Sequence, residues 1–230
     1  MKKYALIVAG GSGTRMKTSE LKQFIPVAGK PLLMHTMERF IHYDPAIPVI
    51  LVLPGSQHDH WKQLCEISGF NFPHLLVEGG RTRFHSVQNG LSFMQDEGIV
   101  FIHDGVRPFV TSETLQKCYD TALQTGNAIP AIPVAESIRQ IEKNRSFPVN
   151  RDKFVLIQTP QTFRISLIKS AYRQNYSTEF TDDASVLEKT GETIHLVEGN
   201  RENIKITWPE DLLYAEHLLE NRNTQQKREL

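Results

Sequence analysis

The chain has 230 residues, a length that fits one large domain, or one domain with an appendage, and that allows a sizeable core to be buried. Lys+Arg and Asp+Glu each number 26, which leaves a formal net charge of zero and excludes a global basic field that would recruit nucleic acid or an anionic membrane surface. The composition, with 40% hydrophobic and 23% charged residues, is that of a soluble globular protein, and no stretch approaches the length of a membrane span.

Short apolar runs rich in β-branched residues alternate along the chain with segments of helical periodicity. The predicted strands occupy residues 4–9, 49–53, 75–77, 99–102, 128–134, 154–157 and 193–197. Between them, apolar residues recur at helical spacing in 33–41, 84–94 and 115–123, and Pro209 opens a last helix with acidic residues in its first turn. This alternation predicts an α/β fold with a mainly parallel central sheet and makes an antiparallel α+β domain the less favoured alternative.

Residues 133–160 interrupt this alternation. They contain strand-like pieces around the polar turn 142–146 and no helical pattern, which predicts a β-hairpin arm that projects from the sheet. An exposed hairpin is marginally stable by itself, so we expect a partner subunit to cover it and the protein to be a homodimer. The polar tail 221–230 is expected to fray, and since no linker or repeat divides the chain, residues 1–230 are predicted to form one domain.

The cysteines and the N-terminus both indicate an intracellular protein. Cys65 and Cys118 fall in helix-like segments, where we expect reduced, buried thiols rather than a disulfide or a metal pair. The apolar run that follows Met1-Lys2-Lys3 is too short for a signal peptide and ends in glycines. We therefore expect a cytoplasmic protein.

The first predicted strand runs into a glycine-rich turn, GGSGTR at 10–15, and Lys22 follows on the same connection. The spacing matches neither the dinucleotide-binding fingerprint nor the Walker loop. In open α/β sheets ligands bind outside the carboxyl ends of the strands, where this turn would lie. Its glycines would let backbone N–H groups approach a triphosphate, and Arg15 and Lys22 could flank it. The alternative interpretation is a tight turn with two solvated charges, which the arginine and lysine make less favoured.

A second candidate is the stretch FIHDGVRPFV at 101–110, in which a buried strand ends at Asp104. A carboxylate in this place is well suited to hold Mg²⁺ that arrives with a nucleoside triphosphate. A helix-capping role is excluded for Asp104, because the next helix is predicted to begin near Thr111 or Ser112. His103 lies on the opposite face of the strand and is interpreted as structural rather than as a general base.

The remaining polar motifs are individually weak. In EGGRTRFHS, at 78–86, the basic residues either reach phosphate or are solvated arginines at a helix start. Thr181 is interpreted as a helix N-cap. The sequence contains no convincing Ser/His/Asp or Cys/His arrangement and no His/Cys cluster with zinc spacing. The remaining means of catalysis are substrate positioning and positive charge, which are what phosphoryl or nucleotidyl transfer requires.

Together and in this order, five motifs resemble those of a known enzyme family. They are AGGSGTRM…KQFIPVAGKP, HDGVRP, TPQTF, TDDAS and NIKIT.PEDL. They are similar to the 2-C-methyl-D-erythritol 4-phosphate cytidylyltransferases of the non-mevalonate isoprenoid pathway, and the likeness runs from about Tyr4 to Leu219. The resemblance implies a Rossmann-like nucleotidyltransferase domain, CTP and a polyol phosphate as substrates, Mg²⁺ as cofactor, and a homodimer joined by the arm.

The resemblance also implies roles for individual residues. Arg15 and Lys22 match the catalytic cations that stabilise charge on the α-phosphate of CTP, and Asp104 matches the Mg²⁺-linked aspartate. The positions expected around the nucleotide are Gly10, Gly11, Gly13, Gly80, Ser86 and Gly105. The positions expected to hold the acceptor are Arg107, Ser137, Arg151, Thr159, Thr181 and Lys205, with Arg151 reaching in from the partner's arm.

The sequence departs from the family pattern at four places. Ser137 replaces a common threonine and keeps its hydroxyl, and Leu21 replaces a common proline. Arg81 stands where some members have an acidic residue, and Gly105-Val106 where Ala-Ala is frequent; these two departures leave the acceptor open. Ribitol 5-phosphate cytidylyltransferases share the same motifs and are the alternative. A sugar-1-phosphate nucleotidyltransferase and a catalytically silent nucleotide-binding module are less favoured, because HDGVRP argues against the first and the trio Arg15, Lys22 and Asp104 against the second.

Overall fold

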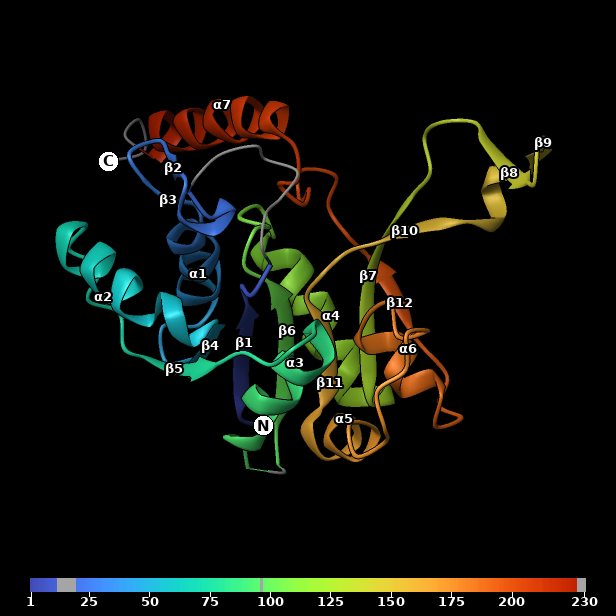
Figure 1. Ribbon diagram of the computed structural model, residues 1–230, viewed down its shortest axis with the longest axis horizontal. Helices are drawn as coiled ribbons and strands as arrows, with labels where there is room; N and C mark the ends of the chain where they lie inside the picture. The colour runs from blue at the N-terminus through green and yellow to red at the C-terminus, as the bar shows by residue number, and fades with distance from the viewer. Residues whose placement is uncertain (12–19, 96, 227–230) are drawn as a thin grey trace.

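A central sheet organises the protein, whose structure, a computed structural model, describes residues 1–11, 20–95 and 97–226, with side chains described through 221. The strands β1 (Lys3–Val8), β4 (Val49–Leu53), β5 (His74–Glu78) and β6 (Ile99–Asp104) run parallel, with β1 between β4 and β6. The full order is β10-β7-β11-β6-β1-β4-β5, and β12 pairs with β7. The predicted α/β fold with a mainly parallel sheet is confirmed (Figure 1).

The far half of the sheet is mixed. The strand β11 (Gln161–Arg164) runs antiparallel between β6 and β7 (Asn127–Pro133). Beyond them, β10 (Val155–Ile157) is antiparallel to β7 and β12 (Leu196–Glu198) is parallel to it. Sequence reasoning missed β11, and it placed the last strand at 193–197.

Helices cover both faces of the sheet because its strands alternate their apolar side chains. In β1, Leu6 faces a cluster formed with α3 (Arg83–Ser92), while Ile7 faces the opposite cluster. The first cluster also takes in α5 (Ile165–Ala171) and α6 (Asp183–Glu188). The second contains side chains of α1 (Leu32–Tyr43), α2 (His58–Ile67) and α4 (Ser112–Thr125). Cys65 and Cys118 are both free thiols, as expected; Cys118 is buried there, whereas Cys65 is only half-buried.

A third apolar cluster attaches the C-terminal helix α7 (Pro209–Gln226) to the small hairpin of β2 (Pro26–Val27) and β3 (Lys30–Pro31). Pro209 opens this helix, as predicted. The helix continues to Gln226, so part of the tail that was expected to fray is helical, and the remainder lies outside the described residues. Among the described residues, none of the helices has the length and apolar character needed to cross a bilayer.

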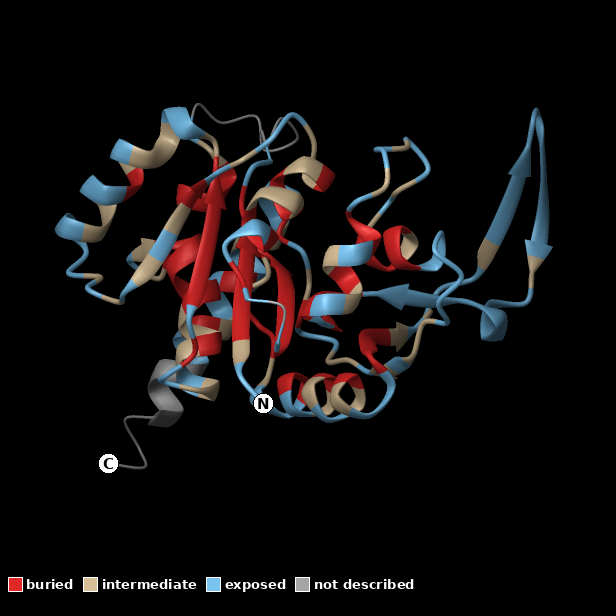
Figure 2. Ribbon diagram, turned by 90° about the horizontal axis from the view of Figure 1, so that it is seen from below, coloured by how far each residue is buried: buried red, intermediate tan, exposed pale blue. Residues whose placement is uncertain are grey.

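The predicted arm is present as a hairpin of β8 (Ile138–Glu142) and β9 (Arg145–Val149). The two strands pair antiparallel, and Lys143 turns the chain with a φ of 52°. Figures 1 and 2 show the hairpin standing away from the sheet, with mostly exposed residues along both strands. The turn region 142–146 was placed correctly. That a partner subunit covers the arm remains a prediction.

The close approach of α3 to β1 generates a stability prediction. A Cβ built on Gly90 would collide with the buried side chain of Leu6 and lie 3.1 Å from Val52 Cγ2. Gly90→Ala should therefore lower the free energy of unfolding by about 1–3 kcal/mol, because overpacking outweighs the roughly 1 kcal/mol that alanine gains in a helix. Urea denaturation measures the difference. Ser92→Ala, at an exposed site of the same helix, is the control, and a stabilised Gly90→Ala protein would contradict the packing argument.

Candidate functional site

A cavity of about 330 Å³ opens where the parallel strands β1 and β6 end and α3 begins. This is the edge of an α/β sheet at which ligands bind. The described residues that line it are Val8, Ala9, Gly10, Gly11, Lys22, Gln23, Gly80, Arg81, Thr82, Arg83, Ser86, Asp104, Val106 and Lys205. The structure thus brings together Gly10, Gly11, Lys22, Gly80, Ser86, Asp104 and Lys205 from the predicted set. Gly13 and Arg15 lie outside the described residues.

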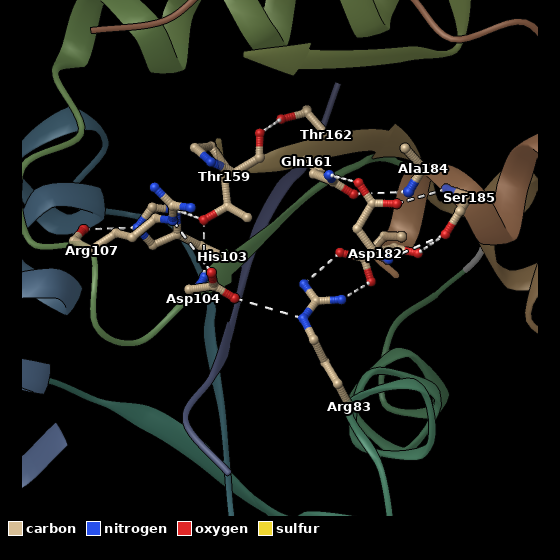
Figure 3. Close-up of polar contacts among 12 residues, drawn as sticks. Arg83, His103, Asp104, Arg107, Thr159, Gln161, Thr162, Asp182, Ala184 and Ser185 are labelled. Carbon is tan, nitrogen blue, oxygen red and sulfur yellow. Dashed lines mark hydrogen bonds and ion pairs between the residues drawn. The ribbon is translucent and has the colours of Figure 1, made fainter. Parts of the chain in front are cut away.

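Asp104, the last residue of β6, is the acidic residue of this lining. Its side chain is only 10% exposed, yet three cations lie around it. Lys205 Nζ is 3.0 Å from Oδ2. Arg107 Nε is 3.3 Å from Oδ2 and Arg83 Nε is 3.6 Å from Oδ1 (Figure 3). Burial by itself would raise the pKa of Asp104, but these cations outweigh it and hold the pKa well below its usual range. The carboxylate is therefore ionised and its Oδ1 carries no short hydrogen bond to the described residues.

Beneath Asp104, a buried chain of hydrogen bonds fixes the backbone. The Asp104 N–H donates to Thr159 Oγ1 at 3.1 Å, and Thr159 Oγ1 lies 3.0 Å from His103 Nδ1. His103 Nε2 lies 2.9 Å from the Arg107 carbonyl, which can only accept. We therefore assign the proton of His103 to Nε2 and the hydroxyl proton of Thr159 to the bond with Nδ1. His103 is structural, as expected, and Thr159 acts on Asp104 from below rather than lining the cavity.

The wall formed by α3 is shaped by a glycine and two hydroxyl groups. The Gly80 N–H donates to Ser86 Oγ at 3.0 Å, and a Cβ on Gly80 would collide with His85. Thr82 caps α3 by accepting from the His85 N–H. Position 80, in the turn before the helix, must therefore be a glycine, and its backbone lines the cavity.

Lys22 is positioned by its neighbours in the short helix η2 (Lys22–Phe24). Gln23 Nε2 donates to the Ala9 carbonyl at 2.9 Å, and the Phe24 ring stacks on Trp61 with centroids 6.2 Å apart. These contacts tie the segment to the end of β1 and to α2. Lys22 itself is 8% exposed and lines the cavity, so the residue is largely shielded from solvent at the site.

Arg83 is the site residue that sequence reasoning did not identify. It was considered only as a solvated or phosphate-reaching arginine, but its NH1 and NH2 each donate to Asp183 at 2.7 Å. Asp183 is completely buried and follows the N-cap of α6. The predicted N-cap, Thr181, is wrong: the N-cap is Asp182, which accepts from the Ser185 N–H in a capping box. Thr181 lies exposed just before the helix.

Other predicted residues lie away from the cavity. A Cβ on Gly105 would lie 2.7 Å from Ala9 Cβ, so this glycine permits β1 and the loop after β6 to pack closely, and it is absent from the cavity lining. Arg107 contacts Asp104 and donates to the Asn203 carbonyl at 2.8 Å. Ser137 and Arg151 are exposed on the arm, where Arg151 donates to the Ala135 carbonyl.

Comparison with known proteins assigns this architecture to a family. The model of the IspD family, 2-C-methyl-D-erythritol 4-phosphate cytidylyltransferase, matches residues 4–221. The chain belongs to this family. A relative of that name from Bacteroides thetaiotaomicron is 52% identical over 219 residues, covering 95% of this chain and 100% of its own.

Two further relatives extend the comparison to sequence and to structure. A Porphyromonas gingivalis protein of the same name is 48% identical, covering 95% of this chain and 98% of its own. The crystal structure of 4-diphosphocytidyl-2C-methyl-D-erythritol synthase from Anaerococcus prevotii is similar with a TM-score of 0.79 and 30% identity, covering 95% and 96%. The resemblance inferred from the motifs is confirmed, and the fold is that of a Rossmann-like nucleotidyltransferase.

The buried His103 generates a prediction for pH dependence. Burial lowers its pKa to about 4 from the ordinary 6.5, although the Arg107 carbonyl and Asp104 oppose this. Between these two pH values the unfolded chain binds a proton that the folded protein does not, so stability is complete above pH 6.5 and falls as pH drops toward 4. The contribution is about 3 kcal/mol.

His103→Gln should remove this part of the pH dependence. Denaturant titrations at pH 7 and pH 4 compare the loss of unfolding free energy in wild type and variant. His42→Gln, at an exposed position, is the control and should keep the wild-type slope. Equal losses in wild type and His103→Gln would show that His103 takes up its proton alike in the folded and unfolded chain.

Proposed function

We propose that this protein is a cytidylyltransferase that joins CTP to 2-C-methyl-D-erythritol 4-phosphate and releases pyrophosphate, a step in isoprenoid precursor synthesis. The observation that carries the proposal is the cavity itself, whose described lining contains four cationic side chains, Lys22, Arg81, Arg83 and Lys205, and one carboxylate, Asp104. Even with Arg83 paired to Asp183 outside the lining, the cations outnumber the carboxylates. Such an excess of positive charge suits two phosphate-bearing substrates. The relatives at 48–52% identity favour methylerythritol phosphate as the acceptor.

The residues present fit a magnesium ion that arrives with the nucleotide. Mg²⁺ is typically held by one or two carboxylates together with substrate phosphates, and Asp104 offers an ionised carboxylate whose Oδ1 has no short hydrogen bond to the described residues. The described residues contain no cluster of three or more His, Cys, Asp or Glu side chains able to hold an ion by themselves. When bound, the ion would neutralise charge on the triphosphate and on the departing pyrophosphate.

The chain's own residues then act by positioning and by charge. The phosphate of the acceptor is an anion near neutral pH and attacks the α-phosphorus without a general base. Lys22, fixed at the cavity, stabilises the negative charge that develops there, together with Arg15 as the family resemblance implies. Lys205, 42% exposed, is available to hold the acceptor's phosphate.

The same proposal includes a homodimer in which the arm serves the partner's site. Ser137 and Arg151 are exposed on the arm and absent from the cavity of their own chain. The arm and the strand beside it also expose large apolar side chains, namely Ile141, Phe147, Phe154, Val155, Leu156 and Ile157. A partner that covers them would bury this surface. We also propose a cytoplasmic enzyme, since both substrates are small, charged molecules that do not cross a bilayer unaided.

Pyrophosphate release tests the proposed reaction. With CTP and Mg²⁺, we expect release to depend on methylerythritol phosphate and to be at least about tenfold slower with ribitol 5-phosphate at equal concentration, since one acceptor is bound by fitted polar groups. A reaction without acceptor is the control. Preference for ribitol 5-phosphate would identify the alternative enzyme. CTP binding with no pyrophosphate release in the presence of either acceptor would identify a silent nucleotide-binding module.

Subunit mixing tests the role of the arm. If each site takes Lys22 from one chain and Arg151 from the other, Lys22→Ala and Arg151→Ala homodimers should each be nearly inactive. Refolded together, about half of the dimers are mixed, and each mixed dimer has one intact site, so activity should recover to roughly a quarter of wild type.

The matched control mixes Lys22→Ala with Lys205→Ala. Both residues line the cavity of the same chain, so every site still carries one lesion and no recovery is expected. Absence of recovery in the first mixture, after refolding is verified, would show that Arg151 serves its own chain or does not bind substrate.

A further inference from the structure

Arg83 lies between two carboxylates that come from distant parts of the chain. Its NH1 and NH2 donate to the two oxygens of Asp183 at 2.7 Å each, and its Nε lies 3.6 Å from Asp104 Oδ1. Figure 3 shows the Arg83 guanidinium reaching from α3 toward Asp104 and toward the start of α6 at Asp182. The side chain is 31% exposed and forms part of the cavity wall.

The planar fork of Arg83 is already occupied. Arginine grips a phosphate best through two parallel N–H groups, and here both point at Asp183. Asp183 is fully buried and also accepts from the Tyr172 hydroxyl at 2.6 Å. Turning the fork toward a ligand would leave this buried carboxylate without its cation, which is costly. Arg83 is therefore a poor phosphate ligand, although it lies on the cavity wall.

What remains free to act is the Nε edge, which faces Asp104. Lys205 and Arg107 both approach Oδ2, so Arg83 is the described cation that balances Oδ1. At 3.6 Å it attracts the carboxylate without forming a short hydrogen bond, so Arg83 itself does not occupy the lone pairs of Oδ1. Lys205 is 42% exposed and can turn toward a substrate, whereas Arg83 is locked by Asp183.

We propose that Arg83 is a positioning residue for the transfer reaction: anchored by Asp183, it fixes the carboxylate of Asp104 in the orientation that receives the nucleotide's divalent cation. The inference rests on the proposed function. The alternative role for Arg83 is that of a direct phosphate ligand. The two roles differ in their effect on the affinity for CTP with and without metal.

Isothermal titration calorimetry with CTP, in the absence of acceptor, separates these roles. Arg83→Lys keeps a positive charge but loses the planar fork, and Asp183→Asn weakens the anchor while Arg83 stays in place. Both variants should bind metal-free CTP within about twofold of wild type, whereas the gain in affinity that Mg²⁺ adds should fall by about tenfold or more. The matched control is Arg164→Lys at the end of β11, outside the cavity lining; it removes a guanidinium contact to the Leu123 carbonyl of α4 and should change neither quantity.

A double-mutant cycle in kcat gives the second readout. Arg83→Lys should lower kcat by roughly tenfold to a hundredfold in the wild-type background, because misplacing a reactive group costs that much. In an Asp104→Asn background the same change should cost less than about threefold, because its target is already lost. Thermal melting of every variant, with and without CTP, reports whether each protein is folded.

The outcomes separate the inference from the proposed function. If the wild-type protein neither binds CTP nor releases pyrophosphate, the proposed function itself is wrong. With an active wild type, weakened binding of metal-free CTP would make Arg83 a phosphate ligand, and additive losses with Asp104→Asn would make it independent of Asp104. A lowered melting temperature, together with a wild-type increase in CTP affinity on adding Mg²⁺, would show that Arg83 has only a structural role. Each of these three results overturns the inference, and where Arg83→Lys does not fold, Asp183→Asn decides.

Discussion

An ionised carboxylate at the end of a buried strand is the constraint on which the site depends. Asp104 is only 10% exposed, and a buried charge is tolerated when it is paired. Its partners come from three separate places: Arg83 opens α3, Arg107 follows β6, and Lys205 precedes α7. Satisfying this one charge therefore draws together segments that are distant in sequence. These ion pairs fix the segments that line the cavity against the carboxyl ends of the sheet strands.

Cationic side chains outnumber carboxylates in the described lining of the cavity. Arg83 is paired with Asp183, while Lys22, Arg81 and Lys205 also line the space, and Asp104 is the acidic residue among the described lining. Like charges held near one another lower the stability of the unliganded protein, and a polyanion that enters offsets the repulsion. The same arrangement gives a reaction without a general base its means of catalysis, since preorganised cations stabilise the charge that forms in transfer.

Sequence patterns predicted those parts of the structure whose causes are local. The strand at 49–53 was placed with its observed bounds, because VILVL is wholly buried and Pro54 follows it. The strand β11 was missed, since Gln161–Arg164 is short and mixed in polarity, and its first three residues are buried in a tertiary context, between β6 and β7, that leaves no local pattern. Asp104 and Lys22 could be found because strand ends converge in an α/β sheet. Arg83 could not, because its partner lies 100 positions away and that pairing leaves no local pattern.

The residues proposed for the nucleotide and for the acceptor differ in where the structure places them. Lys22, Gly80 and Ser86 meet at one cavity of the body, held by contacts within the same chain. Arg151, in contrast, is exposed on the arm, where its bond to the Ala135 carbonyl orders the arm but does not bring it to that cavity. In the proposed dimer, the described nucleotide-side residues thus come from one chain, and the acceptor side also needs the partner's arm. Because the proposed transfer depends on placing two phosphates in line, a single chain that binds CTP would lack part of the geometry to transfer it, and turnover would be confined to the assembled, acceptor-bound dimer.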